Sequence, residues 1–200
     1  MRLFVAISIY LFFQTSTLFA NAEEITADTT IYIIDTDSSK VEWACDLHKG
    51  YVLLEDGVIK ILNGKIVGGT FNICMESIVD VDIDYELMRI TLENTLKSIE
   101  FFYTEKYHYS SFTIDYTKTT QGSCSIYGDF TLLGVTKCIN FQYDLILESD
   151  SIWAKTEEII IDRTDWGVTS MSKDDAKSDK SFIVPNEIKI IVTLVAHKAY

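Results

Sequence analysis

Apolar and polar residues alternate along most of the chain beyond residue 30, which is the pattern of β-strands with one buried face. In the run 41–46, apolar Val41, Trp43 and Cys45 occupy alternate positions. Comparable runs lie at 31–34, 58–62, 65–75, 112–116, 124–132, 135–147, 152–163 and 183–196. The pattern therefore predicts about eight or nine strands.

Turn signals join neighbouring runs into hairpins. Asn63-Gly64 separates two runs, and Asn-Gly is typical of a two-residue hairpin turn. Leu133-Gly134 separates another pair of runs. Gly68-Gly69 lies inside a run, where paired glycines indicate a bulge or a tight bend. These turns make the strands that they join antiparallel.

One stretch favours a helix. Met88, Leu92 and Leu96 recur at intervals of four residues, so we predict a short helix over about residues 85–98. The adjacent Phe101-Phe102 follow it, and burying one Phe side chain contributes about 1.5–3 kcal/mol. We expect this pair to anchor the helix where it meets the sheet.

One all-β domain accounts for this pattern better than two domains, and the charged run 171–181 indicates a solvated loop. Many antiparallel strands favour a sandwich or a closed barrel, and closure removes exposed sheet edges. The face expected to point inward is apolar and comprises Val41, Trp43, Cys45, Phe71, Ile73, Met75, Cys124, Ile126, Phe130, Leu132, Ile139, Phe141, Tyr143, Leu145, Ile159, Ile161, Ile188, Ile190, Val192 and Leu194. Such a face either packs solidly against itself or lines a cavity for an apolar ligand, and the pattern leaves both open.

Residues 1–22 have the composition of a secretory signal peptide. Basic Arg2 precedes an apolar run, and Ala20-Asn21-Ala22 is a small-x-small cleavage site. The apolar run is too short for a transmembrane helix, which needs about 20 residues. We therefore expect a cleaved leader, a domain over 23–200, and a periplasmic or secreted location without stable membrane insertion.

The net charge argues against one class of partner, and the cysteine content bears on disulfide bonds. The formal net charge of −13 repels phosphate backbones, which argues against nucleic acid as a partner. An exported protein with four cysteines, Cys45, Cys74, Cys124 and Cys138, permits disulfides, but a chain of this length does not need them. The sequence does not decide between four free thiols and at least one disulfide, and it does not indicate which cysteines would pair.

The sequence carries no recognisable catalytic or metal-binding motif. Cys45, Asp46 and His48 make only half of a metal site, and the run 80–84 lacks the ligand spacing and the glycine of a calcium loop. We expect neither a metal nor a catalytic residue.

Arg163 stands out because it follows the inward-facing positions 159 and 161. Burying it requires a partner, and Asp162 and Asp165 are the nearest carboxylates. The expected role is an ion pair that closes one end of the barrel, or else a polar group that orients a ligand head.

Several blocks together resemble one family, and their order and spacing carry the resemblance. The blocks are Ser39-x-Val41-x-Trp43 with His48-x-Gly50 and Gly57, Asn63-Gly64-Lys65 through Gly68-Gly69-x-Phe71 and Met75-x-Ser77-Ile78, Leu96-Lys97-Ser98 with Phe101-Phe102 and Lys106-Tyr107, and Gly128-Asp129-Phe130-Thr131 with Gly134-Val135-Thr136-Lys137 and Ile161-Asp162-Arg163-Thr164. The chain resembles YceI-like proteins, periplasmic polyisoprenoid-binding proteins with a lipocalin-like barrel. It departs from them at His108 and Cys138, where the family usually has Pro.

The resemblance implies a lipocalin-like antiparallel β-barrel of about eight strands with one short helix segment. It further implies an apolar tunnel, a bound isoprenoid-type lipid such as a quinone or a polyprenyl chain, no other cofactor, no established catalysis, and a possible homodimer. The residues that we expect to contact the lipid are Trp43, Phe71, Ile73, Phe130, Phe141, Tyr143, Ile161, Arg163 and Ile190.

Two other functions remain open. An enzyme could act on a lipid or a quinone in the same tunnel, with Cys45 or Cys124 as the reactive side chain. A structural or envelope-stress protein with a filled core is the other alternative.

Overall fold

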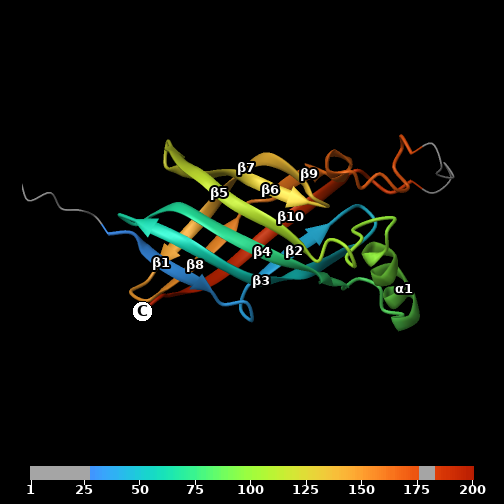
Figure 1. The fold of residues 1–200 in the computed structure, drawn as a ribbon, viewed down its shortest axis with the longest axis horizontal. Coiled ribbons are helices and arrows are strands. Elements are labelled where there is room, and N and C mark those ends of the chain that lie inside the picture. The colour runs from blue at the N-terminus through green and yellow to red at the C-terminus, as the bar shows by residue number, and fades with distance from the viewer. Residues whose placement is uncertain (1–27, 176–182) are drawn as a thin grey trace, which may run out of the picture.

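The computed structural model describes residues 28–175 and 183–200 of the chain. The predicted signal peptide, residues 1–22, and part of the predicted loop, residues 176–181, lie outside the described residues. One antiparallel sheet curls into an elongated barrel, and a single α-helix sits at one end of it (Figure 1).

The strands are β1 (Thr30–Ile34), β2 (Lys40–Ala44), β3 (Lys49–Leu62), β4 (Lys65–Asp80), β5 (Tyr109–Thr120), β6 (Ser123–Leu132), β7 (Val135–Leu147), β8 (Ser151–Thr156), β9 (Ile159–Asp162) and β10 (Glu187–Lys198). The strands β3 to β7 and β10 are long, and β1, β2, β8 and β9 are short. The helices are α1 (Glu86–Lys97) and the short 3₁₀-helix η1 (Arg163–Trp166).

The sheet closes through β10. Strands β2 to β8 follow one another around the barrel, and β10 pairs with β2 along one edge and with β8 along the other. β1 and β2 pair with successive parts of β3, so together they fill one position of the ring, and β8 and β9 share another beside β10. The ring therefore has 8 strand positions, which confirms the predicted barrel.

Three two-residue turns join the long strands, at 63–64, 121–122 and 133–134. Both residues of each turn have positive φ, between 51° and 88°, and the second is always Gly, as the twist of a tight hairpin requires. The first and the third turn were predicted. The second, Gln121-Gly122, was missed because the strands beside it are polar and exposed.

The predicted bulge lies one residue before the glycine pair. Ile61 is opposite Ile66, but Lys60 is opposite Gly68, so Val67 is an extra residue in β4. A Cβ on the following Gly69 would lie 2.7 Å from a backbone oxygen of β3, which explains why a residue without a side chain stands there.

α1 matches the predicted helix within one residue at each end. None of its residues is fully buried, yet Phe101, just after it, is buried in the core, and Phe102 packs against the core. The expected anchor at this junction is therefore present. No helix of the described residues has the length and apolar character needed to cross a membrane.

The two ends of the barrel differ in the length of their connections (Figure 1). The end away from α1 carries the turns 63–64 and 121–122 and the short link between β7 and β8. The α1 end carries the segment 81–108 and the long connection from β9 to β10. Every position predicted to face inward is buried or half-buried, and β1, β3 and β5 add further core residues such as Ile34, Ile59 and Phe112.

Candidate ligand-binding site

The barrel is hollow. A cavity of about 670 Å³ lies at the α1 end, and it is lined mostly by apolar side chains of the barrel strands and of α1. A second cavity of about 100 Å³ lies deeper and is lined almost wholly by apolar residues of the strands. Protein cores are packed closely enough that voids larger than a water molecule are few, so a hollow of this size is a built feature.

The two cavities adjoin each other. Val41, Ile73, Phe130 and Ile190 line both, so the smaller cavity lies directly beside the larger one inside the barrel. The larger cavity has the size of typical small-molecule sites, which run from about 300 to 1,000 Å³. The expectation of an inward apolar face is confirmed, and the face surrounds space instead of filling it.

All nine predicted ligand contacts line this hollow. Trp43, Ile161 and Arg163 line the larger cavity. The smaller cavity is lined by Phe71, Phe141 and Tyr143. Ile73, Phe130 and Ile190 line both. That these side chains contact a bound lipid stays a prediction.

Aromatic rings form part of the wall of the smaller cavity. Phe112 lies between Phe71 and Phe141, with ring centroids 6.5 Å and 5.3 Å away. Phe112 was not predicted as a ligand contact, although the strand in which it lies was predicted. A Cβ on Gly128 would come within 2.6 Å of the Phe112 ring, so glycine at that position makes room for this aromatic wall.

α1 contributes residues that the sequence did not indicate as site residues. The side chains of α1 that line the larger cavity are Leu87, Met88, Thr91, Leu92, Thr95 and Leu96. The four-residue spacing of Met88, Leu92 and Leu96 predicted the helix and its apolar face. It did not indicate what that face covers, because the position of the helix depends on the closure of the barrel.

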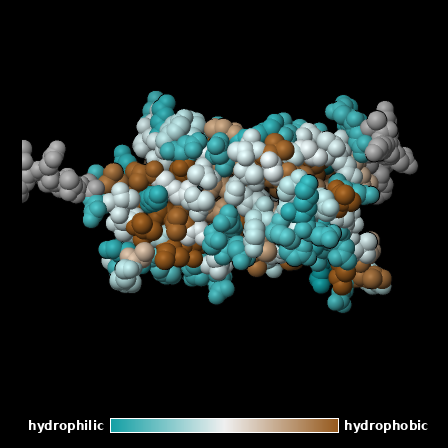
Figure 2. Space-filling view, viewed as in Figure 1, coloured by the Kyte–Doolittle hydropathy of each residue, from teal (hydrophilic) through white to brown (hydrophobic). Residues whose placement is uncertain are grey.

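Apolar side chains of α1 also remain exposed to solvent. Leu87 and Met88 are 65% and 61% exposed, although both line the cavity. In Figure 2, apolar residues gather at the α1 end and over β1 at the other end. α1 therefore forms a thin apolar rim over the hollow, with one side toward the cavity and the other toward water.

Arg163 is buried, with 2% of its surface exposed, and it lines the larger cavity. Its guanidinium donates four hydrogen bonds, all to backbone carbonyls, those of Pro185, Val168, Ser170 and Val184. Burial lowers the pKa of Arg163 from its ordinary value, and the charge of Asp162 opposes that shift. Arg163 thus ties the loop after η1 to the start of β10.

The ion pair predicted for Arg163 is wrong. Asp165 pairs with Lys137, 2.9 Å away, and Asp162 accepts hydrogen bonds from the amide and hydroxyl of Thr164 at the start of η1. Backbone carbonyls satisfy the buried guanidinium instead, because the loop folds around it. Only one of its five N–H groups has no acceptor among the described residues, so little of it faces a ligand.

Met171 and Ser172 correct the prediction of a solvated loop. Residues 171–175 have no regular structure, as expected, but Ser172 is buried and Met171 is half-buried and lines the larger cavity. The charged residues that follow made the whole run look solvated.

Trp43 presents an unused donor. Its indole Nε1 is buried and has no hydrogen-bond partner among the described residues, and the side chain lines the larger cavity. Leaving a buried donor unpaired costs about 1–3 kcal/mol, so a ligand oxygen that accepts from it gains that energy.

Tyr143 lines the smaller cavity, as do two other residues with polar groups, Lys155 and Thr156. Burial raises the pKa of the Tyr143 hydroxyl to about 12, and the neighbouring Cys124 adds to the rise. The Tyr143 side chain therefore stays neutral at any physiological pH and does not bring a charge into the apolar wall.

The four cysteines are free thiols. The possibility of a disulfide, which the sequence left open, is not realised in the structure. Cys45 lines the larger cavity, whereas Cys124 lies beside Tyr143 and lines neither. Of the two thiols considered for an enzyme, only Cys45 reaches the hollow.

Residues 32–196 match the family model of the YceI-like domain, which reaches from β1 into β10. The chain belongs to the YceI-like domain family. The resemblance drawn from the sequence blocks is thereby confirmed. A comparison with curated proteins finds no match.

Solved structures share the fold of this YceI-like domain at low sequence identity. BcnA of Burkholderia cenocepacia has 15% identity and a TM-score of 0.64, over 82% of this chain and 99% of that one. A polyisoprenoid binding domain from Saccharophagus degradans has 12% identity and a TM-score of 0.60, over 84% and 98%. The Campylobacter jejuni YCEI protein has 18% identity and a TM-score of 0.52, over 68% and 75%. At these identities the likeness shows the fold.

Proposed function

We propose that this YceI-like protein binds an isoprenoid-type lipid, a quinone or a polyprenyl chain, with its tail in the two adjoining cavities. The observation that carries the proposal is the pair of adjoining apolar cavities of about 670 Å³ and about 100 Å³. A tail buried there gains about 25 cal/mol for each Å² of apolar surface removed from water. The polyisoprenoid binding domain from Saccharophagus degradans, which shares the fold, supports the choice of ligand class.

The head of the lipid lies in the larger cavity in this proposal. Trp43 Nε1 is a buried donor without a partner among the described residues, so it favours an oxygen acceptor such as a quinone carbonyl or a hydroxyl. The deeper cavity is lined almost wholly by apolar residues, and the exceptions are Tyr143, Lys155 and Thr156. The tail therefore points away from α1.

We also propose that the protein is exported. The leader composition of residues 1–22 supports a periplasmic or secreted carrier. We propose a binding role and not a catalytic one, because no hydrogen bond within the described residues joins the Cys45 thiol to a base, although His48 also lines the larger cavity. A homodimer stays a prediction.

Replacing Phe141 with Glu tests the proposed site. We expect the wild-type protein, purified after expression with its leader, to carry a lipid adduct in native mass spectrometry. F141E places a carboxylate in the apolar wall and should lose the adduct, because burying an unpaired charge is costly. Asn140→Glu is the matched control, since Asn140 is exposed on the same strand.

Identical adducts on both variants, with both folded by circular dichroism, would show that the wall residues are wrongly assigned. A wild-type protein that carries no adduct, under conditions in which a known lipid carrier keeps its own, would overturn the function itself.

A further inference from the structure

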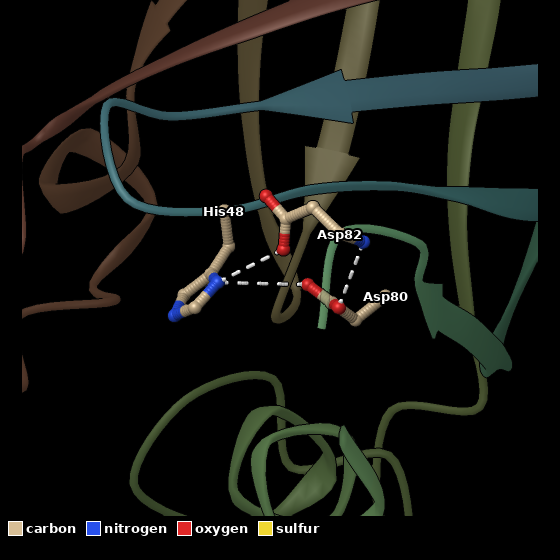
Figure 3. Close-up of side chains that lie close together, drawn as sticks. All are labelled: His48, Asp80 and Asp82. Carbon is tan, nitrogen blue, oxygen red and sulfur yellow. Dashed lines mark hydrogen bonds and ion pairs between the residues drawn. The ribbon is translucent and has the colours of Figure 1, made fainter. Parts of the chain in front are cut away.

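A histidine and two aspartates converge at the rim of the larger cavity. His48 lies in the turn between β2 and β3, Asp80 ends β4, and Asp82 follows two residues later (Figure 3). His48 Nδ1 lies 3.2 Å from Asp82 Oδ1 and 3.7 Å from Asp80 Oδ2. One ligand atom from each residue lies within 4.8 Å of the other two.

The Asp80 carboxylate is buried and only half satisfied. Its side chain has 0% exposure, and Oδ1 accepts hydrogen bonds from the amides of Asp82 and Ile83. Oδ2 has no hydrogen-bond partner among the described residues and points toward His48 (Figure 3). A buried carboxylate oxygen without a partner is costly, so the cluster is incomplete without a cation or a proton near Oδ2.

We propose that His48, Asp80 and Asp82 bind one divalent transition-metal ion, of the class of Zn²⁺ or Mn²⁺. Two ligands about 2.1 Å from one ion at the tetrahedral angle lie about 3.4 Å apart, and the distances from His48 Nδ1 to the two carboxylates bracket that value. Imidazole beside carboxylates suits first-row transition metals better than Ca²⁺ or Mg²⁺, which prefer oxygen alone. The two carboxylates balance the charge of the ion, and water completes the coordination.

An ion at this position would connect two segments of the chain. It joins the turn before β3 to the segment that leads into α1. The Asp80 amide already donates to Glu93 of α1, 3.0 Å away, so the metal site and α1 share an anchor. Metal binding thus holds down the start of the segment that forms the rim of the cavity, and it does not depend on lipid binding.

A second acidic group provides a contrast. Asp115, Asp129 and Cys138 also bring three ligand atoms together, but all three residues are exposed. They carry no buried unpaired atom among the described residues, so their charges are satisfied by water. Nothing there calls for an ion, and this group serves as the internal control.

The test is a metal titration of tag-free protein stripped with EDTA. Isothermal titration with Zn²⁺ and with Mn²⁺ near neutral pH should show one site per chain. His48→Ala and Asp80→Asn should each weaken it at least about tenfold, as expected for loss of a ligand. Asp115→Asn should leave the affinity unchanged. Zn²⁺ should also raise the melting temperature of the wild type but not that of H48A.

Two results would overturn the proposal. One is no saturable binding of either ion up to millimolar concentration. The other is equal binding by wild type and H48A, which would place any ion elsewhere. His48 is partly exposed, so H48A keeps the fold. Should D80N fail to fold by circular dichroism, Asp82→Asn replaces it, with the same expected loss.

Discussion

Tyr143 illustrates how one residue responds to its place in the apolar wall. Its pKa is raised by burial to about 12, so the fold favours the neutral phenol. The resulting stability is complete below about pH 10, where Tyr ionises in unfolded chains, and is lost as pH rises to about 12.

The pH dependence of unfolding checks this assignment. Between pH 10 and 12, wild type should lose more free energy of unfolding than Tyr143→Phe, which has no proton to lose. Denaturant titrations across that range measure the difference. Parallel losses in the two proteins would contradict the burial of the hydroxyl.

Arg163 shows what a sequence reveals about a single residue and what it does not. Its burial was expected from its place after an inward-facing run. Its partners were not, because they are carbonyls of residues 168–170 and 184–185, and every residue type has a carbonyl. The unpaired Trp43 Nε1 was equally hidden, since pairing depends on atoms brought together only by folding.

At the scale of the element, α1 lines the larger cavity although it is not part of the buried core. None of its residues is buried, yet Leu92 lines the larger cavity. Leu92→Ser should therefore weaken lipid binding by about 1–1.5 kcal/mol, or roughly five- to tenfold, through lost apolar contact. The melting temperature of lipid-free protein should hardly change.

Ile90→Ser is the matched control, because Ile90 lies on α1 but does not line the cavity. Lipid dissociation rates of the two variants, measured by transfer to acceptor vesicles, separate them. Equal rates would mean that α1 merely covers the hollow without touching the ligand.

Strands and hairpins were predictable because their signals are local. Asn63-Gly64 marks its own turn, and alternation marks the buried face of each strand. The location of α1 over the mouth and the sharing of one ring position by β1 and β2 were not predictable. Both depend on β10, which is far away in sequence and closes the sheet.

At the scale of the whole molecule, the proposed function couples the stability of the barrel to lipid binding. A ligand that binds only the folded barrel adds about 2.7 kcal/mol when its concentration is 100 times its dissociation constant. Solvent extraction of the lipid should therefore lower the melting temperature, and adding the lipid back should restore it. Calorimetry of loaded and extracted protein tests this, with Phe141→Glu as the variant that should not respond.

The unequal ends of the barrel bear on the direction in which the proposed lipid enters and leaves. Among the described residues, the end away from α1 carries the turns 63–64 and 121–122 and the short link between β7 and β8, whereas the long connections lie at the α1 end. On the proposed function, the lipid therefore enters and leaves beneath α1, with its tail leading on entry and its head leading on release. If release follows that order, an acceptor of the proposed lipid meets its polar head before its apolar tail.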